Sequence, residues 1–206
     1  MGKRIICADA LRWLANDCPP CAIVTSPPEM AELQISLAEY EEWYGNAIGL
    51  CMRAAGPGCP VVVYATDRKA EGQWVSKPAL IVSIAKAYGW RLLWHRIVLR
   101  RDVGKVDLHR PGYAHLLAVG PAECRPGVAL PDVMERGHML YPDAMGFIPG
   151  RVSVNFAGTY SNLIIDPFCG RGTVPAIAEA LGFEAIGVDI DPTQCAHAEK
   201  ISLKAQ

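Results

Sequence analysis

Two glycines near the end of the chain lie where a helix is expected to begin, in the segment Asp166-Pro167-Phe168-Cys169-Gly170-Arg171-Gly172-Thr173. The apolar run 163–165 predicts a buried strand before this segment, and 174–181 has the spacing of a helix after it. Gly170 and Gly172 carry no Cβ, so a ligand could approach the backbone of the turn closely. The helix would begin with unpaired N–H groups and a partial positive charge, which favours an anionic group.

A second acidic residue follows at an informative distance. Residues 184–188 predict another buried strand, and this strand ends at Asp189, which is 19 positions after Gly170. In nucleotide-binding sheets, a carboxylate about 20 residues after the glycine turn meets a ribose. The order of strand, glycine turn, helix, strand and acid therefore predicts half of a nucleoside-cofactor site.

Two further strand ends near the N-terminus carry polar groups. Residues 4–8 predict a strand that ends at Asp9, and Ala10 begins a helical pattern. The carboxylate of Asp9 could contact a ligand, or it could cap the helix, and the two roles are compatible. The apolar run 21–24 predicts another strand, which leads into Thr25-Ser26-Pro27-Pro28-Glu29. Neither proline can donate to a sheet, so the pair fixes an extended backbone whose carbonyls could accept hydrogen bonds from an exocyclic amine.

The segment 166–173 resembles the S-adenosylmethionine (SAM) loop of the amino-methylating DNA methyltransferases, usually written DPFxGxGT. Ser26-Pro27-Pro28 resembles the catalytic tetrad of the same family, SPP or DPP followed by an aromatic residue. The tetrad precedes the SAM loop in this chain, which is the order of the circularly permuted (β-type) members. The resemblance implies that SAM is the cofactor, with contacts from Asp9, Ala10, Thr25, Asp166, Pro167, Phe168, Cys169, Gly170, Gly172, Thr173 and Asp189.

The fourth tetrad position departs from the family pattern, because Glu29 stands where an aromatic ring would stack on the substrate base. Stacking would then come from another aromatic residue, and the candidates are Tyr40, Trp43, Tyr44 and Trp74. Glu29 could supply the carboxylate that Ser26 lacks relative to a DPP tetrad, or it could be a solvated loop acid. The resemblance implies that Ser26, Pro27, Pro28 and Glu29 form the catalytic segment.

Cations follow two of the expected strands. Arg68 and Lys69 come after the strand predicted at 60–64, and a basic loop separates the strands predicted at 90–99 and 113–120. Loops at carboxyl ends of strands lie beside the ligand in open α/β sheets, so these cations could meet substrate phosphates. An incidentally charged hairpin tip is the alternative. The candidate substrate-binding residues are Arg68, Lys69, Arg100, Arg101, Lys105 and Arg110.

The length of 206 residues predicts one domain with a full core. The alternation of strands and helices and the resemblance together predict an α/β fold, the Rossmann-like sheet of class I SAM methyltransferases. This sheet would be mostly parallel, would end in an antiparallel pair (90–99 and 113–120) and would have a circularly permuted strand order. We expect one long helix over 32–55, a last helix over 192–205 and an irregular insert over 121–150, with no separate target-recognition domain.

Composition limits the other possibilities. A net charge of −1 argues against a binder that is basic over its whole surface, but not against a local basic patch. Eight cysteines without a secretion signal indicate reduced thiols and a cytoplasmic location. Cys18 and Cys21 have metal-ligand spacing, but no second pair completes a site, and the two prolines between them also suit a simple turn, so no metal is predicted. No apolar run approaches the ~18 residues of a membrane span.

The sequence thus predicts transfer of the SAM methyl group to an exocyclic amine of a nucleic-acid base in DNA or RNA. Serine in the first tetrad position favours N4 of cytosine, with N6 of adenine as the second possibility. The missing recognition domain suggests that the insert, a homodimer or a partner subunit reads the target. A SAM-binding subunit without activity and a small-molecule N-methyltransferase are the alternatives.

Overall fold

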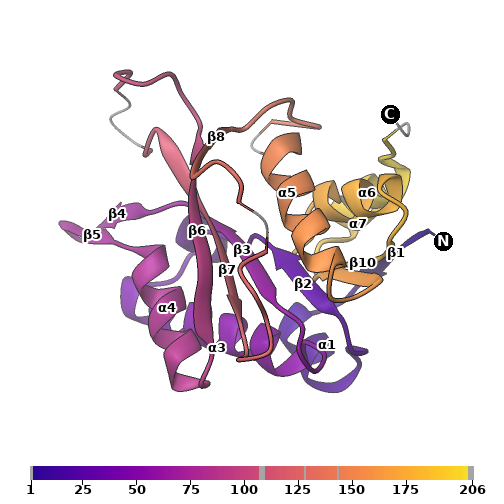
Figure 1. The fold of residues 1–206 in the computed structure, drawn as a ribbon. Coiled ribbons are helices and arrows are strands. Elements are labelled where there is room, and N and C mark those ends of the chain that lie inside the picture. Colours follow the sequence, from indigo (N-terminus) through magenta and orange to yellow (C-terminus); the bar gives the residue numbers. More distant parts are fainter. Residues whose placement is uncertain (1, 107–109, 128, 143, 204–206) are drawn as a thin grey trace.

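An eight-stranded sheet forms the centre of the computed structural model, which describes residues 2–106, 110–127, 129–142 and 144–203 (Figure 1). Most neighbouring strands are parallel, and β7 runs antiparallel to both of its neighbours, β3 and β6. The strands lie in the order β1 (Lys3–Cys7), β10 (Glu184–Asp189), β9 (Leu163–Asp166), β2 (Ala22–Thr25), β3 (Val61–Ala65), β7 (Tyr113–Gly120), β6 (Arg91–Leu99) and β8 (Val133–Glu135).

The strand order brings the two ends of the chain together. β9 and β10 come late in the sequence, yet they lie between β1 and β2, which begin it. The glycine turn after β9 and the polar segment after β2 therefore follow adjacent strands. This arrangement confirms the predicted permuted α/β sheet with an antiparallel strand. That strand lies inside the sheet, because β6 and the short β8 extend the sheet beyond it.

Helices cover both faces of the sheet (Figure 1). Alternate residues of the buried strands face the two sides, as in β2, where Ile23 packs in one core cluster and Val24 in the other. One face is covered by α1 (Ala10–Asn16), α3 (Leu37–Ala54) and α4 (Lys77–Ala87), and the other by α5 (Phe147–Gly158), α6 (Thr173–Ala180) and α7 (Pro192–Lys200). The remaining elements are α2 (Met30–Leu33) and a hairpin of β4 (Arg68–Ala70) and β5 (Gln73–Val75).

The single helix predicted over 32–55 is wrong, because the chain forms two helices there. The short α2 ends at Gln34, whose backbone is left-handed with φ of 56°. Ser36 then begins α3 with a capping box, in which Ser36 and Glu39 satisfy each other's backbone N–H groups. Apolar residues with helical spacing continue across this break, and they conceal it in the sequence.

The described residues of 121–150 contain regular secondary structure. β8 pairs with β6 inside this segment, and α5 begins within it, at Phe147. The helix predicted over 192–205 is shorter, because α7 ends at Lys200, and Ala205 lies outside the described residues. Among the described residues, none of the helices combines the length and apolar character that crossing a membrane requires.

Candidate active site

A cleft of about 1190 Å³ opens at the carboxyl ends of the central strands. It is lined by the residues that follow β1, β2, β3, β9 and β10, so segments far apart in the sequence share it. Most of the residues expected at a cofactor or tetrad site line this cleft: Asp9, Ala10, Ser26, Pro27, Pro28, Glu29, Asp166, Pro167, Phe168, Cys169, Gly170, Thr173 and Asp189. This is the position at which open α/β sheets bind their ligands.

The glycine turn is held in place by a buried acid. Asp166 is 4% exposed, and its Oδ1 accepts hydrogen bonds from the Thr25 hydroxyl at 2.7 Å and from the Phe168 N–H at 3.2 Å. Burial raises the pKa of Asp166 to about 7, and these two hydrogen bonds oppose the shift. Thr25 does not line the cleft, so it positions Asp166 from beneath.

Gly172 adopts the conformation that the turn requires. It has φ of 85° and lies directly before α6. A Cβ at Gly172 would lie 2.8 Å from the Cβ and 2.9 Å from the Cα of Ala198 on α7. Both the backbone conformation and the close approach of α7 therefore exclude a side chain at this position.

The two strand-end carboxylates have different neighbours. Asp189 Oδ2 accepts from the Gly170 N–H at 2.9 Å, and its Oδ1 accepts from the Asp191 N–H at 2.9 Å. Each oxygen keeps a further lone pair for a ligand hydroxyl. Asp9 Oδ1 accepts from the Arg12 N–H at 2.9 Å and caps α1. Asp9 also lines the cleft, so the capping role and a ligand contact are compatible.

Two aromatic residues that the sequence did not assign to the cofactor half line the cleft beside these acids. The rings of Trp43 and Phe168 are tilted against each other at a centroid distance of 5.7 Å. Tyr141 lies near the glycine turn, and the Arg171 guanidinium is 5.4 Å from the centre of its ring. Trp43 belongs to a helical pattern and Tyr141 to a segment rich in proline and glycine, so neither was named among the expected cofactor residues.

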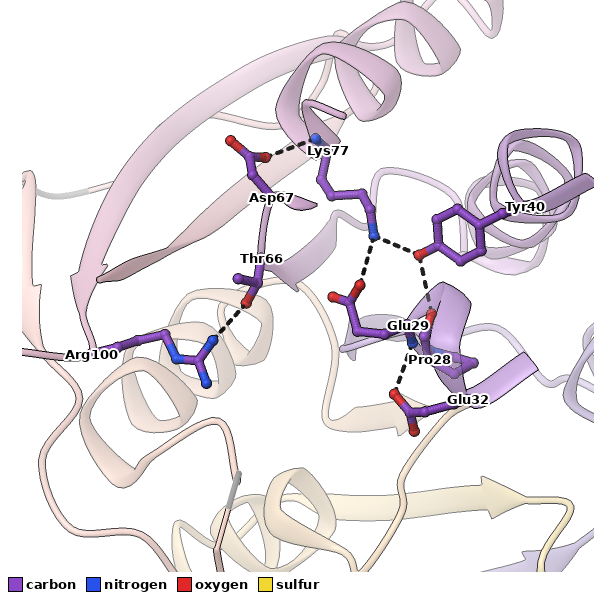
Figure 2. Close-up of polar contacts among 8 residues, drawn as sticks. All are labelled: Pro28, Glu29, Glu32, Tyr40, Thr66, Asp67, Lys77 and Arg100. Carbon is purple, nitrogen blue, oxygen red and sulfur yellow. Dashed lines mark hydrogen bonds and ion pairs between the residues drawn. The ribbon is translucent and has the colours of Figure 1, made fainter. Parts of the chain in front are cut away.

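A buried lysine, Lys77, which the sequence did not indicate, supports the predicted tetrad segment 26–29. Lys77 Nζ lies 3.4 Å from Glu29 Oε2 and donates to the Tyr40 hydroxyl at 2.5 Å (Figure 2). The Tyr40 hydroxyl donates in turn to the Pro28 carbonyl at 3.1 Å. Burial raises the pKa of Glu29 and lowers the pKa of Lys77, and the charge of each partner opposes the shift of the other. Glu29 therefore has a buried ion-pair partner, although its own side chain remains 35% exposed.

The four candidates for base stacking separate into two pairs. Tyr40 and Tyr44 are each 1% exposed and pack against Lys77, so neither ring can face a substrate. Trp43 lines the cleft, and Trp74 is 47% exposed on the β4–β5 hairpin. The Trp74 indole N–H donates to Asp67 Oδ2 at 3.0 Å, which fixes this ring beside the end of β3.

The candidate cations also lie in different places. Arg68, Lys69, Arg100 and Arg110 line the cleft, and Arg100 Nη1 donates to the Thr66 hydroxyl at 3.5 Å (Figure 2). Arg101 lines a smaller adjoining cavity of about 270 Å³, and Lys105 lines neither cavity. The adjoining cavity also contains Arg136, which the sequence did not single out.

Within the described part of the chain, no group of three or more His, Cys, Asp or Glu side chains could hold a metal ion. The sulfur atoms of Cys18 and Cys21 are 3.9 Å apart, at the start of β2 and away from the cleft.

Comparison with known proteins shows which solved structures share this fold. No family model matches the sequence, and no curated protein matches it either. Solved structures match almost the whole chain at low identity. TTHA0409 of Thermus thermophilus, a candidate DNA modification methylase, has a TM-score of 0.71 at 17% identity over 97% of this chain and 93% of its own.

Two further structures agree with this match. The PvuII DNA methyltransferase, which is cytosine-N4-specific, has a TM-score of 0.78 at 13% identity and covers 97% of this chain and 86% of its own. M1.HpyAVI in complex with SAM has a TM-score of 0.67 at 16% identity and covers 96% of this chain and 98% of its own. The chain therefore has the fold of the class I SAM methyltransferases, in the arrangement shared with these DNA methylases.

Proposed function

We propose that the protein is a SAM-dependent methyltransferase that modifies an exocyclic amino nitrogen of a DNA base. One observation carries this proposal: the glycine turn, the strand-end acids and the Ser-Pro-Pro segment line the same cleft. The fold supports it, because the DNA methylases compared above have the same architecture. N4 of cytosine is the favoured acceptor and N6 of adenine the second candidate.

The residues of the cleft fit SAM. The N–H-rich turn at Gly170 and Gly172 suits the carboxylate end of the cofactor, and Asp189 has lone pairs for the ribose hydroxyls. Trp43 and Phe168 offer apolar surface for the adenine, beside Asp9. The buried Asp166 provides a negative charge that complements the positive charges of the methionine end. SAM itself supplies an electrophilic methyl group on a sulfonium centre.

The tetrad would orient the amine. The lone pair of an exocyclic amine is delocalised into the ring, which makes the nitrogen a poor nucleophile. Hydrogen bonds from its N–H groups to Ser26 Oγ and the Pro27 carbonyl would direct that lone pair towards the methyl group. Most of the rate gain would then come from positioning and electrostatics. A base within a duplex would have to be flipped into the cleft.

We also propose that residues 1–206 act as one catalytic domain. Arg68, Lys69, Arg100 and Arg110 line the cleft, which supports the proposal that they contact phosphates beside a flipped base. Recognition of a DNA sequence then depends on the segment 121–150, on a second copy of the chain or on a partner subunit. RNA in place of DNA is a possible substrate that the test must include.

The test is product identification. The purified protein is incubated with methyl-labelled SAM and either genomic DNA or total RNA, and the polymers are digested to nucleosides for mass spectrometry. We expect labelled N4-methyldeoxycytidine or N6-methyldeoxyadenosine. Label only in RNA would overturn the choice of DNA. SAM binding without transfer to either polymer would contradict the proposal and would instead indicate a non-catalytic subunit or a small-molecule enzyme.

A further inference from the structure

Lys77 occupies an unusual place for a lysine. It is the first residue of α4, and its side chain is only 2% exposed. The ammonium group lies 4.5 Å from the ring centre of Tyr40 and 4.7 Å from that of Tyr44. The Lys77 backbone N–H donates to Asp67 Oδ1 at 2.9 Å, which fixes the start of the helix (Figure 2). Lysine is almost never fully buried without partners.

The partners of this ammonium belong to the tetrad. Lys77 Nζ contacts Glu29 Oε2 directly, and it reaches the Pro28 carbonyl through the Tyr40 hydroxyl. The last two residues of the tetrad are therefore both held by one buried cation (Figure 2). Glu29 lines the cleft, whereas Lys77 and Tyr40 do not. The lysine thus lies behind Glu29, on the side away from the substrate.

A stabilising role alone does not explain this arrangement. A buried charge in an ion pair adds little to stability compared with an apolar residue of similar volume, because the buried ammonium loses its hydration. The pocket around Lys77 contains the rings of Tyr40 and Tyr44, so an apolar side chain of the same length would fit such surroundings. The charge instead has a direct effect on Glu29, since an ammonium favours an ionised carboxylate and restricts its orientation.

We infer that Lys77 is a positioning residue that holds Glu29 ionised and turned towards the cleft, as the acceptor of the proton released from the substrate amine. This inference rests on the proposed function. During transfer the sulfonium C–S bond breaks, and its electron pair stays on sulfur. The amine lone pair forms the new N–C bond, and the cationic nitrogen then loses a proton to Glu29. Ser26 cannot take this proton as a carboxylate would, so Glu29 replaces the acid of a DPP tetrad.

Other charged groups also face Glu29 and Lys77. Arg68 on β4 and Glu32 on α2 act on Glu29, and Asp67 and Arg68 act on Lys77. Tyr40 on α3 contributes a hydroxyl whose pKa is raised by burial, so it remains neutral. Lys77 and Arg68 favour the ionised form of Glu29, and Glu32 opposes it.

The main variant is Lys77→Met, which keeps the length and removes the charge. We expect kcat to fall by about 10- to 100-fold, which is the size of effect that misplacing a reacting group produces. The affinity for SAM should stay within about twofold. The acidic limb of the kcat–pH profile should move to higher pH, because Glu29 loses the cation that favours its ionised form. Lys77→Arg should restore part of the rate. Lys86→Met, on the exposed part of the same helix, should leave both kcat and the acidic limb of its pH profile unchanged.

A second measurement does not depend on turnover. Glutamate labelled with ¹³C at the side-chain carboxyl allows the titration of Glu29 to be followed by NMR, with Glu29→Gln to assign the signal. The Glu29 signal should titrate at higher pH in Lys77→Met, or in Lys77→Gln if the first variant does not fold. An unchanged titration, or an unchanged pH limb in folded Lys77→Met, would overturn the inference. If the wild type transfers no methyl group, the proposed function fails, and the NMR titration still decides the role of Lys77.

Discussion

The two halves of the cleft, which we propose bind the cofactor and the substrate, are built in different ways. In the cofactor half, the glycine turn, its buried acid and the following strand-end acid lie within 166–189, and backbone N–H groups join them directly. In the other half, the contacts join side chains from separate segments. Lys77 contacts Glu29 and Tyr40, and Arg100 contacts Thr66 (Figure 2). Backbone contacts within a short stretch of sequence therefore hold one half, and side-chain contacts between distant segments hold the other.

The difference reflects what each half would bind. One cofactor presents the same groups in every reaction, so a fixed turn beside two acids suffices. A substrate differs between enzymes, and long-range side-chain contacts can be exchanged while the sheet remains the same. The aromatic tetrad position illustrates this, because a glutamate with a buried lysine behind it occupies that position here.

The largest effect is expected where the backbone of the cofactor half cannot change. Gly172→Ala would force a Cβ against α7 at φ of 85°. The free energy of unfolding should therefore fall by about 2–4 kcal/mol, and SAM binding should be lost. Gly182→Ala is the matched control, since it has the same φ of 85° but nothing within 4 Å of the added Cβ. Chemical denaturation measures both. An equal fall in the free energy of unfolding of the two variants would contradict the close contact between α7 and the turn.

Asp189→Ala tests the strand-end carboxylate of the same half. The carboxylate would accept a ribose hydroxyl and already holds the Gly170 N–H, so its loss should weaken SAM binding by about 10- to 100-fold. Isothermal titration calorimetry gives the affinity, with Asp17→Asn at the exposed end of α1 as the control. Unchanged affinity would show that the cofactor half is not where SAM binds.

Asp166 predicts a pH dependence of both stability and binding. Its pKa of about 7 lies above the ordinary value of 3.8, so between these values the folded protein holds a proton that the unfolded chain has released. The stability of the ligand-free protein should therefore decrease as the pH rises from about 4 to about 7. A cationic ligand favours the ionised form, so SAM affinity should rise by about tenfold through pH 7, with release of a proton.

Asp166→Asn keeps an oxygen for the Thr25 hydroxyl and removes the charge. Calorimetry in two buffers of different ionisation enthalpy should detect proton release in the wild type and none in this variant. Proton release that persists in Asp166→Asn would assign the titration to another group.

The smallest effects should appear in the substrate half, where each cation contributes one of several contacts. Arg68→Ala should lower the slope of log affinity for DNA against log salt by about 1, because one phosphate contact is lost. Lys105→Ala serves as the comparison, since Lys105 lines neither cavity, and its slope should stay unchanged. Fluorescence anisotropy over a salt series measures both slopes. A lower slope in Lys105→Ala and an unchanged slope in Arg68→Ala would show that DNA contacts the loop that contains Lys105 rather than the cleft.

The sequence predicted which residues of both halves line the cleft, but not the side chains that lie behind Glu29. Asp166, Gly170 and Asp189 are separated by fixed short intervals, so their pattern alone predicts a shared site. Tyr40 and Lys77 have no such pattern: Tyr40 fits an amphipathic helix, and Lys77 reads as an ordinary first-turn residue before a proline. Their contact depends on how α3 and α4 pack on one face of the sheet, which spacing along the chain does not encode. The helix break at Gln34 was hidden for a related reason, because apolar spacing continues across it.

We propose that one half of the cleft binds the cofactor and that methyl transfer takes place in the other. Ser26→Ala tests this most directly when SAM affinity and single-turnover methyl transfer to DNA are measured on the same preparation. We expect SAM binding within about twofold of the wild type and transfer slower by about 100-fold, the usual cost of one lost positioning hydrogen bond in an active site. Transfer at the wild-type rate in Ser26→Ala would show that Ser26 does not orient the amine for methyl transfer.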